Sequence, residues 1–257
     1  MQELEAGILR TEYLGDSKYL IALDCENISR EASPGQFLQV RTSYGTSPFL
    51  RRTFSISGTY PEKNEVRILF QVVGDGTEIL CRFKRGGSLN IIGPLGTGFK
   101  TLVSDSGASL LVGGGIGIAP LLFLSKKLTS LGKKHSFMFG ARNLPGIESI
   151  KAFLPEETMY ATDNGTYGYH GYLHNMLEVN IDKLSPSVIY TCGPDQMMKA
   201  VAVIAQKNNI PCQVSLEERM ACGIGACFGC AIPHKDGRMV RTCVEGPIFD
   251  SREVFFE

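Results

Sequence analysis

The stretch that decides the fold reads MACGIGACFGC from Met220 to Cys230, and a further cysteine follows at Cys243. Four of the eight cysteines lie in this segment, at Cys222, Cys227, Cys230 and Cys243. The gaps between them are four, two and twelve residues. This spacing is typical of the four thiolate ligands of a 2Fe–2S cluster, because soft sulfur ligands complete the tetrahedral coordination of both irons.

Two other uses of these cysteines stay open at this point. A zinc site more often contains two C-x2-C pairs, and this segment contains one. Disulfides require an oxidising compartment and are rarer in a chain of this size. The spacing therefore favours the iron–sulfur cluster over zinc and disulfides, and we interpret the four cysteines outside this segment as small buried hydrophobic residues.

Composition limits the classes of partner. The chain of 257 residues has 26 acidic and 26 basic residues, so its formal net charge is zero. No basic block indicates a nucleic acid or a membrane surface as partner. The N-terminal residues include Glu3, Glu5 and Glu12 and lack an apolar signal core. We therefore expect no secretion and a cytoplasmic location, where thiols stay reduced.

The residues before the cysteine segment divide into two patterns. Residues 1–100 contain short runs of β-branched and aromatic residues between turn residues, which predicts a small antiparallel barrel. Residues 101–210 alternate strands with helices, which predicts a parallel sheet. We expect an α+β multidomain protein with a barrel at 1–100, an α/β domain at 101–210 and a cluster module at 211–257. The expected strands of the first two domains are 7–14, 19–25, 37–42, 52–57, 66–73, 88–92, 109–112, 135–140, 158–162 and 188–192.

Two motifs in the barrel region are candidates for holding a flavin nucleotide. An arginine at Arg52, followed by Thr53 and Ser55 on an expected strand, has the chemistry to hold a pyrophosphate and to address a flavin ring. The GDGT stretch at 74–77 opens an expected helix, whose N–H groups suit a phosphate. An ordinary turn capped by Thr77 explains this second motif equally well.

The α/β region contains a glycine run, GGGIG at 113–117, between an expected strand and an expected helix. This context favours dinucleotide binding at Gly113, Gly114 and Gly115, although the run is not a strict G-x-G-x-x-G and a tight turn is the structural alternative. The last expected strand ends in Cys192-Gly193-Pro194. A carboxyl end that faces the crevice of the sheet suits a nicotinamide.

In this order, the barrel, the α/β domain and the cysteine module resemble the ferredoxin–NADP reductase superfamily. More closely, the chain resembles the electron-transfer subunits of the NAD-dependent dihydroorotate dehydrogenases of class 1B, the PyrK family. The resemblance covers nearly the whole length, and its most specific part is the stretch SLEERMACGIGACFGC at 215–230. The segments LRR at 50–52, SIS at 55–57 and GPLGTGF at 93–99 match as well.

The resemblance implies a set of cofactors and contacts. FAD would lie at Arg52, Thr53, Phe54 and Ser55, at Leu69, Phe70 and Gln71, and at Gly76 and Thr77. NAD(H) would be the co-substrate, and the four cysteines would hold the 2Fe–2S cluster. Phe54 departs from the superfamily, which has tyrosine there, and it lacks the hydroxyl group that could donate a hydrogen bond.

The resemblance also implies a partner and a reaction. The chain would carry electrons between NAD and an FMN-containing catalytic subunit that oxidises dihydroorotate in pyrimidine biosynthesis, in a heterotetramer of two plus two chains. No catalytic residue of its own is expected, because the cofactors perform the chemistry. Two alternatives are a subunit of a ferredoxin–NADP or sulfide dehydrogenase complex, and a cluster-bearing redox sensor without turnover.

Overall fold

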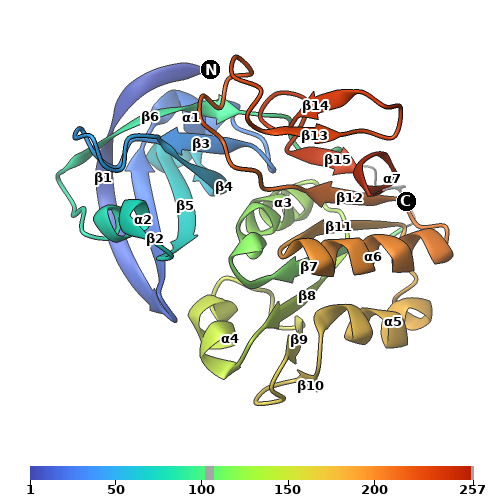
Figure 1. The fold of residues 1–257 in the computed structure, drawn as a ribbon. Coiled ribbons are helices and arrows are strands. Elements are labelled where there is room, and N and C mark those ends of the chain that lie inside the picture. Colours follow the sequence, from blue (N-terminus) through green and yellow to red (C-terminus); the bar gives the residue numbers. More distant parts are fainter. Residues whose placement is uncertain (102–106, 256–257) are drawn as a thin grey trace.

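The computed structural model describes residues 1–101 and 107–255, and its N-terminal part is a closed barrel (Figure 1). Neighbouring strands in the order β1-β2-β5-β4-β3-β6 all run antiparallel. The six strands are β1 (Gln2–Gly15), β2 (Lys18–Asp24), β3 (Phe37–Val40), β4 (Arg52–Tyr60), β5 (Glu65–Gln71) and β6 (Ser88–Leu95). The short helices α1 (Glu26–Glu31) and α2 (Asp75–Leu80) lie in the connections. This confirms the antiparallel barrel.

The second part is a seven-stranded sheet in the order β10-β9-β8-β7-β11-β12-β15. All neighbours are parallel except β12 and β15. The strands are β7 (Ser109–Gly114), β8 (His135–Ala141), β9 (Met159–Thr162), β10 (Tyr169–His170), β11 (Val188–Cys192), β12 (Cys212–Ser215) and β15 (Ile248–Asp250). The helices are α3 (Ile118–Ser130), α4 (Leu144–Lys151), α5 (Leu173–Leu184) and α6 (Asp195–Lys207). The parallel α/β domain is therefore confirmed.

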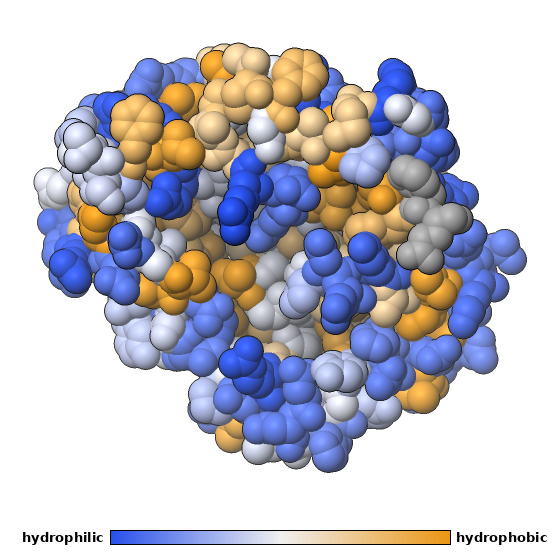
Figure 2. Space-filling model, viewed as in Figure 1, coloured by the Kyte–Doolittle hydropathy of each residue, from blue (hydrophilic) through white to orange (hydrophobic). Residues whose placement is uncertain are grey.

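Helices cover both faces of this sheet, so its strands are buried on two sides. Apolar residues of α5 and α6 pack with Leu110, Val112 and Ile189 on one face. Apolar residues of α3 and α4 pack with Leu111 and Phe139 on the other. The second face is the one turned toward the barrel, and α3 contacts β4 directly (Figure 1). The surface is hollowed between the two parts, where the main pocket lies (Figure 2).

The C-terminal segment shares the sheet of the preceding domain. Its strand β12 continues the parallel order beside β11, and β15 closes the edge antiparallel to β12. Between them stand the cysteine loop and a two-stranded hairpin of β13 (Ala231–Pro233) and β14 (Met239–Arg241), and α7 (Ser251–Val254) follows. Val214 and Phe249 are buried in the core beneath α6. The domain boundary near residue 210 stays a prediction, because the sheet runs across it.

Among the helices in the described ranges, none combines the length and the apolar character that a membrane crossing requires.

Candidate functional site

The four cysteines of the C-terminal loop gather in two pairs. The backbone N–H of Cys227 lies 3.4 Å from the sulfur of Cys222. Cys230 and Cys243 are both buried and pack in one cluster with Phe37 and Leu95 at the edge of the barrel. The backbone of Thr242, next to Cys243, donates to the carbonyl of Cys230 at 3.0 Å. The fold thus places the cluster loop against β3 and β6.

This pairing distinguishes a two-iron cluster from a single metal ion. Two irons with two thiolates each need two separate pairs, which is what the loop provides. All eight cysteines are free of disulfides. The residues present therefore fit a 2Fe–2S cluster better than zinc.

The backbone of the loop stabilises the thiolate of Cys222. Desolvation raises the pKa of Cys222, but hydrogen bonds from the backbone at Ile224, Cys227 and Ala226 outweigh this effect. The net result is a pKa lowered to about 7. Burial and the adjacent Cys230 raise the pKa of Cys243 to about 12. Four crowded thiolates therefore need a cation between them, and iron supplies that charge when the cluster is bound.

Two glycines allow the loop to close on its neighbours. Gly223 has φ of +68°, and a Cβ there would lie 2.5 Å from the amide nitrogen of Gln39 on β3. Gly225 has φ of +86°, and a Cβ there would lie 2.6 Å from Val244. Both positions need a left-handed backbone and a close approach that favour glycine. The guanidinium of Arg241 holds the same loop by donating to the carbonyl of Gly225 at 3.0 Å.

The predicted flavin residues of β4 divide between the two sides of the barrel wall. Thr53 and Ser55 point outward and line a small pocket that also contains Ser215, Glu218 and Met220 from the segment leading to the cysteine loop. Phe54 points inward, where its ring packs 5.5 Å from Phe70. The structure therefore brings Thr53 and Ser55 to the surface shared with the cluster module, and it does not bring the ring of Phe54 there.

The predicted phosphate-binding elements meet at Arg52. Gly76 lies so close to this side chain that a Cβ at Gly76 would be 2.5 Å from the guanidinium Nε. Arg52 also donates to the carbonyl of Leu50 at 2.6 Å. The hydroxyl oxygen of Thr77 accepts hydrogen bonds from the backbone N–H groups of Val73 and Gly74. Thr77 thus caps its own turn, whereas Gly76 leaves room for Arg52 beside that turn.

Of the predicted residues on β5, two side chains face away from the barrel interior. Leu69 packs with the core that faces the α/β domain, and Gln71 lines the main pocket. The side chain of Phe70 lies inside the barrel. A flavin on the outer wall could contact Phe70 only through its backbone.

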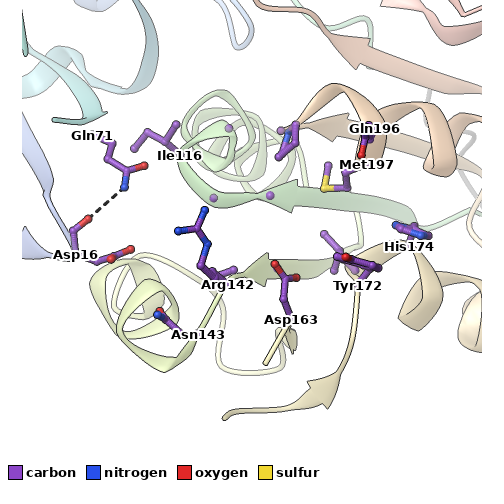
Figure 3. Close-up of a pocket in the computed structure, with 18 of the residues that line it drawn as sticks. Asp16, Gln71, Ile116, Arg142, Asn143, Asp163, Tyr172, His174, Gln196 and Met197 are labelled. Carbon is purple, nitrogen blue, oxygen red and sulfur yellow. Dashed lines mark hydrogen bonds between the residues drawn. The ribbon is translucent and has the colours of Figure 1, made fainter. Parts of the chain in front are cut away.

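The main pocket is a cleft of about 690 Å³ between the barrel and the carboxyl ends of the parallel strands (Figure 3). Asp16, Lys18 and Gln71 line it from the barrel, and Gln71 donates to the carbonyl of Asp16 at 3.4 Å. The opposite wall consists of loops that follow the strands of the sheet. Its residues are 114–117, 140–143, 163, 172–174, 193, 194, 196, 197 and 217. Such a crevice at the strand ends is the usual ligand site of an open α/β sheet.

The glycine run serves two different purposes in this pocket. A Cβ at Gly113 would lie 2.4 Å from Ile118, and one at Gly114 would lie 2.6 Å from the sulfur of Met197. These two glycines therefore permit close packing of the strand against its neighbours. Gly115 has φ of +55° and nothing within 4 Å of a Cβ position, so its backbone is open to a ligand.

In the predicted Cys192-Gly193-Pro194 segment, two residues line the pocket and one lies beneath it. Gly193 and Pro194 line the pocket, and the backbone of Gly193 would lie 2.6 Å from a Cβ at Gly117. The side chain of Cys192 is buried beneath them, and burial raises the pKa of its thiol far above the ordinary value. Cys192 thus supports the pocket floor from below.

Glu217 is a candidate site residue that the sequence motifs did not indicate. It lines both the main pocket and the small pocket beside Thr53 and Ser55. The side chain is reached by solvent through the open cleft, but it stands deep between the barrel and the sheet. Desolvation, followed by the charge of Asp195, raises the pKa of its carboxyl. Glu217 follows β12 by two residues, at a strand end of the sheet, and this strand is not among those expected from the sequence.

We expect Gly115→Val to prevent reduction of the bound flavin by NADH while the protein keeps its flavin. A branched side chain there would occupy the space in front of the loop, and kcat/KM for NADH should fall roughly a hundredfold or more. Gly132→Val is the matched control, because Gly132 also has a positive φ and open space but lies outside the pocket. Stopped-flow absorbance of the flavin measures the effect. Equal rates in the two variants would contradict the loop assignment.

Comparison with known proteins identifies two domains in the chain. Residues 217–255 match the model of the iron–sulfur cluster binding domain of dihydroorotate dehydrogenase B. Residues 111–203 match the oxidoreductase NAD-binding domain. The two matches coincide with the paired cysteines and with the strands and loops around the main pocket.

Two similar proteins match this chain over nearly its full length. The dihydroorotate dehydrogenase B (NAD(+)) electron transfer subunit of Desulforamulus reducens is 37% identical over 98% of both chains. That of Bacillus pumilus is 36% identical over 99% of this chain and 98% of its own. Among solved structures, an NADH-dependent reduced ferredoxin–NADP oxidoreductase superposes with a TM-score of 0.82 at 28% identity, covering 98% of this chain and 90% of that one.

The barrel, the parallel sheet with its glycine loop and the paired cysteines define a reductase of the ferredoxin–NADP reductase type with an added iron–sulfur module. Within that class, the chain belongs to the family of dihydroorotate dehydrogenase B (NAD(+)) electron transfer subunits. The family name itself implies a catalytic partner subunit.

Proposed function

We propose that this chain transfers electrons between NAD(H) and an FMN-containing subunit that oxidises dihydroorotate, through FAD and one 2Fe–2S cluster. The observation that carries the proposal is the two-pair arrangement of Cys222, Cys227, Cys230 and Cys243 beside the barrel, on a chain that also contains an NAD-binding domain. FAD supplies the conversion between hydride transfer and single electrons, since a 2Fe–2S cluster accepts one electron at a time.

The residues proposed to hold FAD lie between the other two sites. Arg52 would hold the pyrophosphate beside Gly76, while Thr53 and Ser55 would address the ring from the outer barrel wall. Glu217 lines both this wall and the main pocket. A flavin at this wall would thus have the dinucleotide pocket on one side and the cysteine loop on the other, which is the order that electron transfer requires.

The residues proposed for NAD(H) are the open glycine loop and the segment after β11. Gly115 presents its backbone to the pyrophosphate, whereas Gly113 and Gly114 keep the strand and helix close enough to form the loop. Gly193 and Pro194 border the nicotinamide end, next to Glu217. Cys192 supports this end from beneath the surface.

The surface around the cysteine loop is suited to the partner subunit. Cys227 is exposed, and the neighbouring side chains of Ile224, Phe228 and Val244 are 47%, 57% and 39% exposed. Hydrophobic residues gather along the edge of the molecule where this loop lies (Figures 1 and 2). Exposed apolar side chains next to a redox centre favour a protein partner that approaches the centre closely. We propose that two such contacts form in a heterotetramer of two plus two chains.

We further propose a cytoplasmic location, which is supported by eight cysteines that form no disulfide with one another.

The alternative assignment, a subunit of a ferredoxin–NADP-type complex, draws support from the solved structure at 28% identity. The relatives at 34–37% identity favour the dihydroorotate system.

We expect Phe228→Ser to weaken binding of the FMN-containing subunit roughly tenfold or more, because an exposed aromatic side chain at the centre of an interface contributes strongly to affinity. Val179→Ser on α5 is the matched control, since Val179 is 69% exposed and α5 lies far from the cysteine loop (Figure 1). Sedimentation or calorimetry with the purified subunit measures both affinities, and iron content shows that the loop is intact. Absence of binding by the unaltered chain would refute the partner assignment.

A further inference from the structure

A buried amide lies between the cysteine loop and the barrel wall proposed for the flavin. Gln39 is on β3, directly opposite Thr53 on β4, and it is completely buried. Its Nε2 donates to the hydroxyl oxygen of Thr53 at 3.1 Å. The same nitrogen lies against Gly223, where a Cβ would come within 2.5 Å of it. One side chain therefore contacts both the outer barrel wall and the residue that follows Cys222 in the cysteine loop.

The other end of this amide has no partner. Among the residues that the structure describes, none donates a hydrogen bond to Oε1 of Gln39, although this oxygen is shielded from solvent. An unsatisfied buried acceptor costs stability, so an amide that bonds at one end only is unusual as a purely structural group. Gln213 on β12 shows the structural arrangement, because it accepts from the backbone N–H of Lys100 at 2.9 Å and donates to the carbonyl of Lys100 at 2.7 Å.

The two contacts of Gln39 belong to different sites. Thr53 lines the small pocket that Glu217 also borders, and this is the wall proposed for the flavin ring. Gly223 adjoins Cys222, one of the four thiols proposed for the cluster. The path from the Thr53 hydroxyl to Cys222 through the amide thus crosses one hydrogen bond and one packed contact. Groups that support a metal-binding loop from behind orient its ligands and tune the centre that they hold.

We infer that Gln39 is a positioning residue for electron transfer between the cluster and the flavin, an inference that rests on the proposed function. Its amide holds the loop at Gly223 against the wall at Thr53, so buried protein rather than water fills the space between the two sites. One electron at a time passes from the cluster to the flavin, and two such transfers with one proton from solvent supply the hydride that NAD accepts. The half-bonded amide is then retained for its position, at a cost in stability.

Replacing Gln39 with methionine keeps an unbranched side chain of similar length and removes the amide. The residue that loses its donor, Thr53, is only half-buried, so its hydroxyl can find another partner. In Gln39→Met we expect transfer between flavin and cluster to slow roughly ten- to a hundredfold. The melting temperature should stay the same or rise, because an unsatisfied buried acceptor is removed.

The matched control is Gln213→Met, the same substitution at the buried glutamine that bonds at both ends. It should have the opposite effects, lowering the melting temperature without slowing the transfer. Gln39→Leu repeats the test at the first site with a side chain of different shape.

The experiment uses the chain loaded with both cofactors. In anaerobic rapid mixing, NADH reduces the flavin by two electrons, one of which passes to the cluster. Absorbance follows the flavin, and electron paramagnetic resonance of freeze-quenched samples follows the reduced cluster. Iron, sulfide and flavin contents and the melting temperature are measured on the same preparations. We expect the reduced cluster to appear more slowly in both Gln39 variants, with the cofactor contents and the rate of flavin reduction unchanged.

Two results would overturn the inference and leave the proposed function intact. One is cluster reduction at the unaltered rate in a Gln39 variant that keeps its iron and its flavin. The other is loss of iron or a lower melting temperature in both Gln39 variants, because the amide would then only support the fold. Failure of the proposed function looks different, since the unaltered chain itself would hold no cluster, or NADH would leave its flavin oxidised.

Discussion

Replacing Cys227 with serine is expected to abolish the iron–sulfur cluster and to separate the two halves of the electron pathway. The unaltered chain, purified anaerobically, should contain about two irons and two acid-labile sulfides. The serine variant should contain almost none, because Cys227 is one of the four paired thiols and a serine hydroxyl is a poor ligand for iron of this kind. Reduction of ferricyanide by NADH should persist, since the residues proposed for FAD and NAD(H) lie outside the cysteine loop.

The matched control for this experiment is Cys81→Ser, the same substitution at a free cysteine outside the loop. It should keep full iron and sulfide content. Stoichiometric zinc without labile sulfide in the unaltered chain, or a normal cluster in the Cys227 variant, would contradict the assignment of the cluster ligands.

The isolated chain is expected not to oxidise dihydroorotate, at any concentration of NAD or of an artificial acceptor. The pocket beside the proposed flavin wall carries the glycine loop proposed for the dinucleotide, so we expect a nicotinamide, rather than a pyrimidine, to meet this flavin. Dihydroorotate oxidation also needs a base placed at the carbon that loses its proton, beside a second flavin. We expect that site on the FMN-containing subunit.

Steady-state assays with dihydroorotate and with NADH, each on the isolated chain, test this division of labour. NADH should support rapid reduction of ferricyanide, and dihydroorotate should have no effect. Substantial dihydroorotate oxidation by this polypeptide alone would place the second site within it. Rapid reduction by NADH would also exclude a sensor without turnover.

Local signals in the sequence were sufficient for several parts of the fold. Strand β11 begins and ends where the alternation predicts, at Val188 and Cys192. The spacing of the cysteines led to the loop that the family model of the iron–sulfur domain matches. In both cases the signal lies within one short segment, so it does not depend on contacts between distant parts of the chain.

The parts that the sequence did not predict depend on distant segments. Helix α1 (Glu26–Glu31) was not predicted, because its six residues show no repeating apolar pattern and no glycine-rich motif precedes them. The side of the barrel wall that Phe54 faces is decided when β6 closes the barrel against β1 and β3. Strand β15 joins β12 from more than thirty residues away, which no local pattern indicates. Gly114 packs against Met197 of α6, whereas Gly115 faces open space. This difference also depends on a distant element of the chain.

The measurement that tests the account most directly is dihydroorotate-dependent reduction of NAD by the complex of this chain with its FMN-containing subunit. Three complexes are compared anaerobically, containing the unaltered chain, the Cys81→Ser variant and the Cys227→Ser variant. We predict equal NADH formation in the first two and a loss of roughly a hundredfold or more in the third, because electrons can no longer leave the partner through the cluster. NADH formation at the full rate by the cluster-free complex would contradict the pathway.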